Sequence, residues 1–284
     1  MPCKMNDVNT RNISLIIARW EFLIRALDDV SYNVVIKLKN HMKSVRKYDD
    51  IEKFNLFISY NNGISSSFFK ACNYKLSDNG NVHKLEFRDC VGTIDWENKK
   101  CSVEISNEGV VSIDSFLRYV TSFLSLVQGG ALVHSAGIIK NNRCFIFPGP
   151  SMSGKSTIAG LFRQRFTVIG EELSIILPSK EGYSVYGTPF LGSSSVLSNY
   201  GGYRLGGIIF HEKSDGYNIR KIEEVEALIR FVENVTFYSS SKKYANLVLE
   251  NSEKITRSVK AFVMDFPNNS EWLSEFDKYL DEMI

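Results

Sequence analysis

The residues with the clearest chemical potential lie in one short glycine-containing segment. It follows the spacing Gly-x4-Gly-Lys-Ser, with Gly149, Gly154, Lys155 and Ser156 at the fixed positions. Glycines at this spacing let backbone amides turn toward a phosphate, while the lysine reaches the β- and γ-phosphates and the hydroxyl ligates Mg²⁺. The segment therefore predicts a site for ATP and Mg²⁺, in which the nucleotide contacts come from Gly149, Pro150, Ser151, Met152, Ser153, Gly154, Lys155, Ser156 and Thr157.

The segments on either side of this loop predict the elements that would hold it. Residues 143–147, which include the apolar run 144–147, are typical of a short buried strand, and residues 155–164 place Ile158, Leu161 and Phe162 at helical spacing. A loop between a strand and a helix N-terminus exposes N–H groups beside the positive end of the helix dipole, which favours an anion. The alternative is an ordinary turn between two buried elements, but the motif and its context favour phosphate binding.

Two adjacent acids are candidates for metal binding and proton transfer. Glu171 and Glu172 follow the apolar run 166–169, which predicts a strand. An ATP site needs an oxygen ligand for Mg²⁺, and a kinase also needs a carboxylate that accepts the proton of the attacking hydroxyl. Adjacent strand residues point to opposite faces, so both acids serve one site only if the backbone bends, which Gly170 permits. The alternative is a solvated acidic pair at the start of a loop.

Three other candidates are less specific. His134 lies in the apolar run 131–139 and could stabilise a phosphate oxygen or move a proton, although a single histidine is more often structural. Arg204, between glycine pairs, could stabilise transition-state charge or could be an ordinary surface residue. The serines at 193–195 could line an acceptor pocket or belong to a loop without a role.

Hydrophobic periodicity predicts two domains. Residues 130–284 are expected to form an α/β core with strands at 207–211 and 261–266 and helices at 225–234, 245–259 and 272–284. Residues 1–129 are expected to form a smaller α+β antiparallel domain that could recognise the acceptor. Its predicted elements are a helix over 13–27, a meander of short strands between 31 and 105, and a helix over 116–127 that ends at Gly129-Gly130.

Composition indicates a globular protein and excludes several classes. The 284 residues are 44% hydrophobic and carry a net charge of only +2, which does not support a nucleic-acid partner. The five cysteines show no Cys-x-x-Cys spacing, so the sequence indicates neither a zinc site nor a disulfide framework. No apolar run approaches 18 residues, and the first residues lack the pattern of a signal peptide, so we expect a cytoplasmic protein without a membrane partner.

Together, four segments resemble the family of HPr serine kinase/phosphorylase. They are residues 130–137, 149–157, 171–172 and 186–190, and the resemblance covers about residues 130–265. It implies a compact P-loop kinase core of the HPr kinase/phosphoenolpyruvate carboxykinase type. It also implies that His134 lies near the transferred phosphate and that Glu171 and Glu172 supply the catalytic base and a Mg²⁺ contact. The bacterial HPr kinases carry Asp-Asp where this chain has Glu-Glu, and the downstream glycine-rich signature of those kinases has no convincing equivalent here, so HPr is not the expected acceptor.

These observations predict an ATP- and Mg²⁺-dependent kinase that transfers the γ-phosphate to a hydroxyl, such as a serine of a peptide, protein or small molecule. The expected catalytic residues are His134, Lys155, Glu171 and Glu172, and the expected metal ligands are Ser156, Glu171 and Glu172. The alternative is a nucleotide-responsive binding module or an ATPase whose transfer chemistry is degenerate, which the Glu-Glu pair favours. A monomer and a homo-oligomer both fit the sequence.

Overall fold

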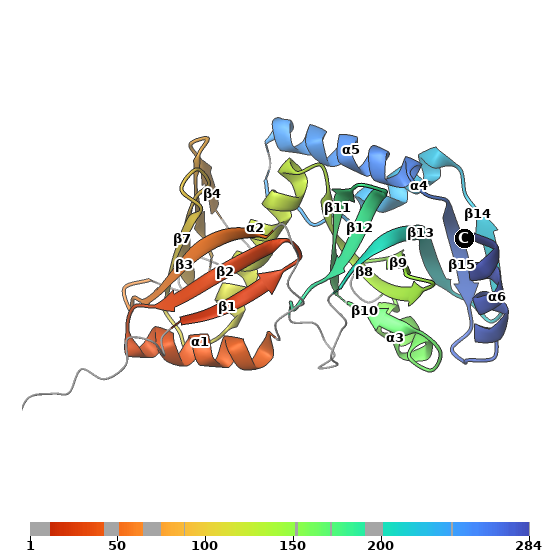
Figure 1. Ribbon diagram of the computed structural model, residues 1–284, viewed down its shortest axis with the longest axis horizontal. Helices are drawn as coiled ribbons and strands as arrows, with labels where there is room; N and C mark the ends of the chain where they lie inside the picture. The colour runs from red at the N-terminus through yellow and green to blue at the C-terminus, as the bar shows by residue number, and fades with distance from the viewer. Residues whose placement is uncertain are drawn as a thin grey trace, which may run out of the picture. The chain divides into compact units, whose positions relative to one another are not determined.

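The computed structural model describes residues 12–42, 51–64, 75–87, 89–150, 153–170, 172–190, 201–239 and 241–283. Within these ranges the chain is a mixed α/β protein with two sheets and six helices (Figure 1). It divides into two compact units, residues 1–118 and 119–284, and the division falls inside helix α2 (Val111–Val127). The α/β class is thus confirmed, whereas the domain boundary expected at 129/130 and the kinase-type core stay predictions.

The first unit contains a seven-stranded sheet with the order β1-β2-β3-β7-β6-β5-β4. Its elements are β1 (Asn12–Ile17), β2 (Trp20–Ala26), α1 (Asp29–His41), β3 (Glu52–Tyr60), β4 (Lys75–Asp78), β5 (Val82–Glu86), β6 (Cys90–Asp95) and β7 (Lys100–Ile105). Buried and exposed residues alternate along β2, β3, β6 and β7, so one face of the sheet carries the core. Gly92 of β6 lies on that face, where a Cβ would come within 2.3 Å of the Phe116 ring of α2.

The helix predicted over residues 13–27 is wrong. This segment is the hairpin β1–β2, joined by a two-residue turn in which Ala18 has φ +52°. Leu23 and Leu27, two members of the expected helical stripe, are 39% and 54% exposed. The buried residues of β2 instead repeat every second position, at Trp20, Phe22, Ile24 and Ala26, which is the period of a strand.

The antiparallel meander is correct only for β4 to β7, which pair in sequence as antiparallel neighbours. β3 pairs in parallel with both β2 and β7, so the sheet is mixed. The reason is that residues 32–38, expected to be extended, belong to α1, and a helical crossover brings the next strand back parallel. Asp28 begins this helix, because its carboxylate accepts a hydrogen bond from the Ser31 amide at 2.7 Å.

Helix α2 and its predicted end are confirmed. Gly129 has φ +81°, and its amide donates to the Leu126 carbonyl at 3.1 Å while the Gly130 amide donates to the Ser125 carbonyl at 2.8 Å. These two bonds form the glycine cap that commonly ends a helix.

The second unit is built on an eight-stranded sheet with the order β10-β8-β11-β12-β13-β15-β14, in which β9 pairs with β8 and β13. Its strands are β8 (Ala131–Lys140), β9 (Arg143–Pro148), β10 (Thr167–Ile169), β11 (Leu173–Ser179), β12 (Gly182–Gly187), β13 (Gly202–Lys213), β14 (Asn218–Lys221) and β15 (Ala261–Phe266). β9 pairs antiparallel with β8 and parallel with β13, and β13 continues in parallel with β15. The predicted strands at 143–147, 207–211 and 261–266 are therefore confirmed within β9, β13 and β15.

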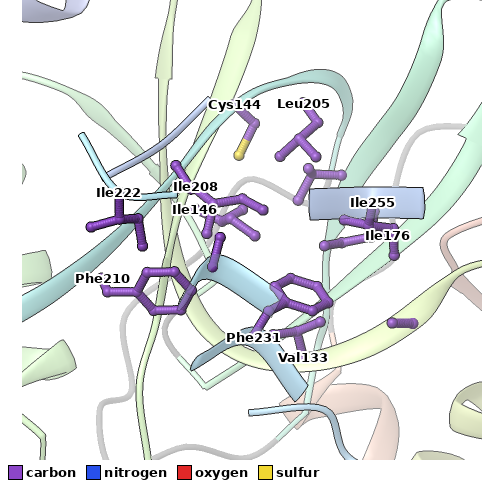
Figure 2. Packing of buried hydrophobic residues seen from close by; sticks show 14 of the residues in the cluster. Val133, Cys144, Ile146, Ile176, Leu205, Ile208, Phe210, Ile222, Phe231 and Ile255 are labelled. Carbon is purple, nitrogen blue, oxygen red and sulfur yellow. The ribbon is translucent and has the colours of Figure 1, made fainter. Parts of the chain in front are cut away.

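Helices cover both faces of this sheet (Figure 1). They are α3 (Lys155–Phe162), α4 (Glu224–Val232), α5 (Lys242–Arg257) and α6 (Leu273–Met283), close to the ranges expected from the sequence. One core joins Ile146 of β9 to Phe231 of α4 and Ile255 of α5 (Figure 2). The other joins Phe145 and Phe147 of β9 to α3 and α6. Because β9 is packed on both faces, its end is held firmly where the glycine-containing loop begins.

Among the helices described, none combines the length and hydropathy that a membrane crossing requires.

Candidate functional site

The glycine-rich loop (residues 149–154) connects β9 to α3, as the sequence predicts. Gly154 precedes α3 with φ +102°, a conformation that side chains rarely adopt. A Cβ at Gly149 would lie 2.5 Å from Ser153 Oγ. Gly154 is thus favoured by its backbone conformation, whereas a side chain at Gly149 would clash with Ser153. Ser151 and Met152 lie outside the described residues.

The side chain of Lys155 folds back under this loop. Lys155 is only 5% exposed, and its ammonium donates hydrogen bonds to the carbonyls of Gly149 at 2.7 Å and Pro150 at 2.6 Å. Burial lowers the pKa of Lys155, and the charge of Glu172 partly opposes that shift. The predicted phosphate-binding lysine therefore lies at the loop, where backbone carbonyls accept hydrogen bonds from its ammonium. The carboxylate of Glu172 is close enough to affect the pKa of Lys155.

Strand pairing brings His134 to the same place. The Gly149 amide donates to the His134 carbonyl at 3.1 Å, and Leu173, the first residue of β11, pairs opposite His134 of β8. Glu172 therefore stands next to His134, with 3.9 Å between Glu172 Oε1 and His134 Nδ1. This separation suits an ion pair with a protonated imidazole but exceeds a hydrogen bond. Both side chains are about one-third exposed, so they are accessible to a ligand.

The backbone bends before the acidic pair, as expected. β10 ends at Ile169, and Gly170 adopts φ +63° before β11 begins at Leu173. Glu171 lies outside the described residues, so its predicted roles in catalysis and metal binding stay predictions. Further along, the Thr188 hydroxyl donates to the Leu173 carbonyl at 2.7 Å, which fixes the segment after β12 to the start of β11.

Ser156 and Thr157 occupy the first turn of α3, and Ser156 is exposed. The first amides of a helix have no acceptor within the helix, and Gly154 has no side chain that could cap them. In the described part of the chain, no group of three or more His, Cys, Asp or Glu side chains could hold a metal ion by itself. Mg²⁺ at ATP sites is commonly held by one or two protein oxygens together with the phosphates, which is what Ser156 and Glu172 could provide.

Two side chains at the loop were not singled out from the sequence. β13 runs parallel to β9, and its last residues place His211 Nε2 at 3.3 Å from Ser153 Oγ. A Cβ at Gly154 would lie 2.9 Å from Lys213 Cε. Parallel neighbours end at the same edge of a sheet, so strand order would have revealed these residues, but the sequence does not give that order.

His211 is 8% exposed, and no residue among those described bonds its Nδ1. Burial, and then the nearby charge of Lys155, lower the pKa of His211 to about 4. The imidazole beside the loop is therefore neutral at physiological pH.

The structure does not bring Arg204 to this site. Arg204 pairs in register with Arg143, the first residue of β9, whereas the loop follows the last residue of that strand. Its guanidinium instead lies 3.4 Å from Glu181 Oε2. The serines at 193–195 lie outside the described residues.

The residues present fit a phosphate ligand. A Cβ at Gly149 would meet Ser153, Gly154 has a backbone conformation that favours glycine, a helix begins after the loop, and the buried ammonium of Lys155 bonds the loop carbonyls. A comparison with known proteins finds no family model that matches this chain and no curated protein with significant similarity to its sequence.

Proposed function

We propose that this protein is a kinase that transfers the γ-phosphate of ATP to a hydroxyl group. One observation carries the proposal: β8, the glycine-rich loop and the start of β11 bring His134, Lys155 and Glu172 together. A cation and a carboxylate beside a loop of this form are groups that phosphoryl transfer uses, and an imidazole can stabilise a phosphate oxygen. The resemblance of residues 130–265 to HPr kinase-like proteins supports a core of that type.

Each residue has a distinct task in the proposed reaction. Lys155 and the amides at the start of α3 hold the phosphates of the substrate, and Ser156 and Glu172 would hold Mg²⁺ with the phosphates. When bound, Mg²⁺ neutralises the charge that develops during transfer. A carboxylate of the acidic pair accepts the hydroxyl proton as the acceptor oxygen bonds to phosphorus and the bond to the ADP oxygen breaks. His134 stabilises a non-bridging phosphate oxygen.

The acceptor class that we propose is an alcohol, such as serine in a peptide, a protein or a small molecule. Glu172 and His134 are about one-third exposed, so an acceptor can approach them from solvent. The proposed carboxylate base supports a hydroxyl nucleophile, because an alcohol must lose its proton during attack.

The proposal is tested by following the label of γ-labelled ATP in a metabolite and peptide extract of the host. With the purified protein and Mg²⁺, we expect label in an acid-stable phosphoester, and no such product with Lys155→Ala. Label only in inorganic phosphate would identify an ATPase. Label that stays on ATP despite measurable binding would identify a nucleotide-responsive module, and either outcome would overturn the kinase proposal.

A further inference from the structure

Strand β13 contributes a second lysine to the edge of the sheet where the glycine-rich loop lies. His211 and Lys213 are two residues apart and therefore share a face of the strand. His211 contacts Ser153 of the loop, and Lys213 lies against Gly154 at the start of α3. The end of β13 thus lies beside the glycine-rich loop, although it follows the loop in sequence by about sixty residues.

The exposed side chain of Lys213 lies next to Gly154. A Cβ there would lie 2.9 Å from Lys213 Cε and 3.8 Å from Lys213 Nζ. The hydrocarbon stem of Lys213 therefore passes next to Gly154, the residue before α3, and its ammonium lies beside the N-terminus of that helix. A second cation is thus held at the end of the helix that already carries the positive pole of the dipole.

The acids nearby do not neutralise this lysine. Glu212 points to the opposite face of β13, where Arg230 Nη1 binds its carboxylate at 2.9 Å. Within the described ranges no carboxylate forms an ion pair with Lys213. The charges of Lys155 and Lys213 both act on His211, which stays neutral between them. The ammonium groups of Lys155 and Lys213 and the N-terminus of α3 together give this edge of the sheet a positive electrostatic potential, which favours an anion.

We infer that Lys213 is a second phosphate-contacting cation of this site, and that the ligand it contacts is a polyphosphate chain. This inference rests on the proposed function, because it takes the glycine-rich loop as the phosphate site. The two ammonium groups lie at different parts of the loop. Lys155 donates to the carbonyls of Gly149 and Pro150, whereas Lys213 lies next to Gly154. The two lysines would therefore hold the phosphates from two sides, as a positively charged clamp.

The variant Lys213→Met separates the effect of the charge from the effect of packing, because methionine lacks the ammonium but keeps an unbranched side chain next to Gly154. Calorimetry with Mg²⁺-ATP and with Mg²⁺ and inorganic tripolyphosphate then measures the contact to phosphate without the base. We expect both affinities to fall by about tenfold, the loss of one charge-assisted hydrogen bond. Lys213→Arg, which keeps the charge, should stay within about threefold of the wild-type affinities.

The matched control is Lys221→Met on β14, an exposed lysine away from the loop, which should bind both ligands as the wild type does. Unchanged affinities in Lys213→Met, with a wild type that binds both ligands, would overturn this inference and leave the proposed function intact. A wild type that binds neither ligand would contradict the proposed function and this inference with it. The midpoint of thermal unfolding without ligand should be the same for wild type and Lys213→Met.

Discussion

Among single residues, Lys155 is central to the proposed chemistry because its charge is buried and, among the described residues, no carboxylate is in hydrogen-bond contact with it. The ammonium is held by the carbonyls of Gly149 and Pro150, and burial lowers its pKa. A buried charge is costly unless it is paired, so an anionic ligand that reaches Lys155 would be bound strongly. The same lysine would then exchange two carbonyl contacts for phosphate oxygens.

Replacing Lys155→Met should reduce phosphoryl transfer by at least about 100-fold, because a cation at the transferring phosphate is lost. The measurement is the initial rate of phosphoester formation from γ-labelled ATP. Lys180→Met, at an exposed position in the turn after β11, is the matched control and should keep full activity. A Lys155→Met protein that is folded and as active as the wild type would exclude this lysine from the reaction.

Glu172→Gln should lower the rate of phosphoryl transfer strongly and the affinity for Mg²⁺-ATP more weakly, because Glu172 is proposed both as a base and as a Mg²⁺ ligand. Glu172 lies 3.9 Å from His134 and acts on Lys155, so its loss should lower the transfer rate by about 100-fold, the usual contribution of a general base. The affinity for Mg²⁺-ATP should change much less than the rate. Glu181→Gln, an exposed acid 73% accessible at its side chain, is the control. An unchanged rate in Glu172→Gln would leave Glu171 as the only base in the acidic pair.

At the level of elements, the site depends on how α3 starts. Gly154→Ala would place a side chain at φ +102° and within 2.9 Å of Lys213, so it should destabilise the protein by about 1–2 kcal/mol and weaken Mg²⁺-ATP binding. Gly160→Ala in the same helix meets nothing within 4 Å and should instead stabilise it by up to about 1 kcal/mol. Urea unfolding of both variants measures the difference.

Equal stabilities for these two alanine variants would contradict the loop conformation that we describe. Retained ATP affinity in Gly154→Ala would show that ligand binding does not require the left-handed residue before α3.

The elements around the site could be predicted from sequence because their signals are local. A strand, a glycine motif and a helix follow one another within residues 143–162, and the bend at Gly170 is a property of one residue. The hairpin β1–β2 could not be distinguished from a helix in this way, because its apolar residues fit the spacing of a helix as well as that of a strand. Only the burial of alternate residues identifies the strands. The capping pair Asp28 and Ser31 was the local signal for α1.

The remaining site residues could not be predicted because they depend on strand order. His211 and Lys213 reach the loop only because β13 pairs in parallel with β9. Arg204, for which the sequence left open a role in charge stabilisation or an ordinary surface position, does not reach the loop, since it lies beside the first residue of β9. Long-range register is set by packing of the whole sheet rather than by any one segment.

For the whole molecule, buried His211 predicts a pH dependence of stability. Its pKa is about 4 in the folded protein and near 6.5 when unfolded, so the unfolded chain binds the proton first as pH falls. The contribution of His211 to the free energy of unfolding should therefore be fully present above pH 6.5. It should be lost as pH falls from 6.5 to 4, which lowers the free energy of unfolding by up to about 3 kcal/mol. The groups that act on this histidine are Lys155, Glu212 and Lys213.

Chemical unfolding of wild type and His211→Gln across this range isolates the contribution, because glutamine keeps a polar group beside Ser153 but does not titrate. We expect a flatter profile in the variant. Parallel profiles for the two proteins would mean that His211 is protonated in the folded state as readily as in the unfolded state.

The central claim, that the glycine-rich loop holds the phosphates of a nucleotide, is tested most directly by a crystal structure with Mg²⁺ and a non-hydrolysable ATP analogue. We expect the phosphates to lie along residues 149–156, with Lys155 Nζ moved from the carbonyls of Gly149 and Pro150 to phosphate oxygens. Nucleotide bound elsewhere, or a soaked crystal in which Lys155 keeps both carbonyl contacts and the loop holds no phosphate, would contradict the claim.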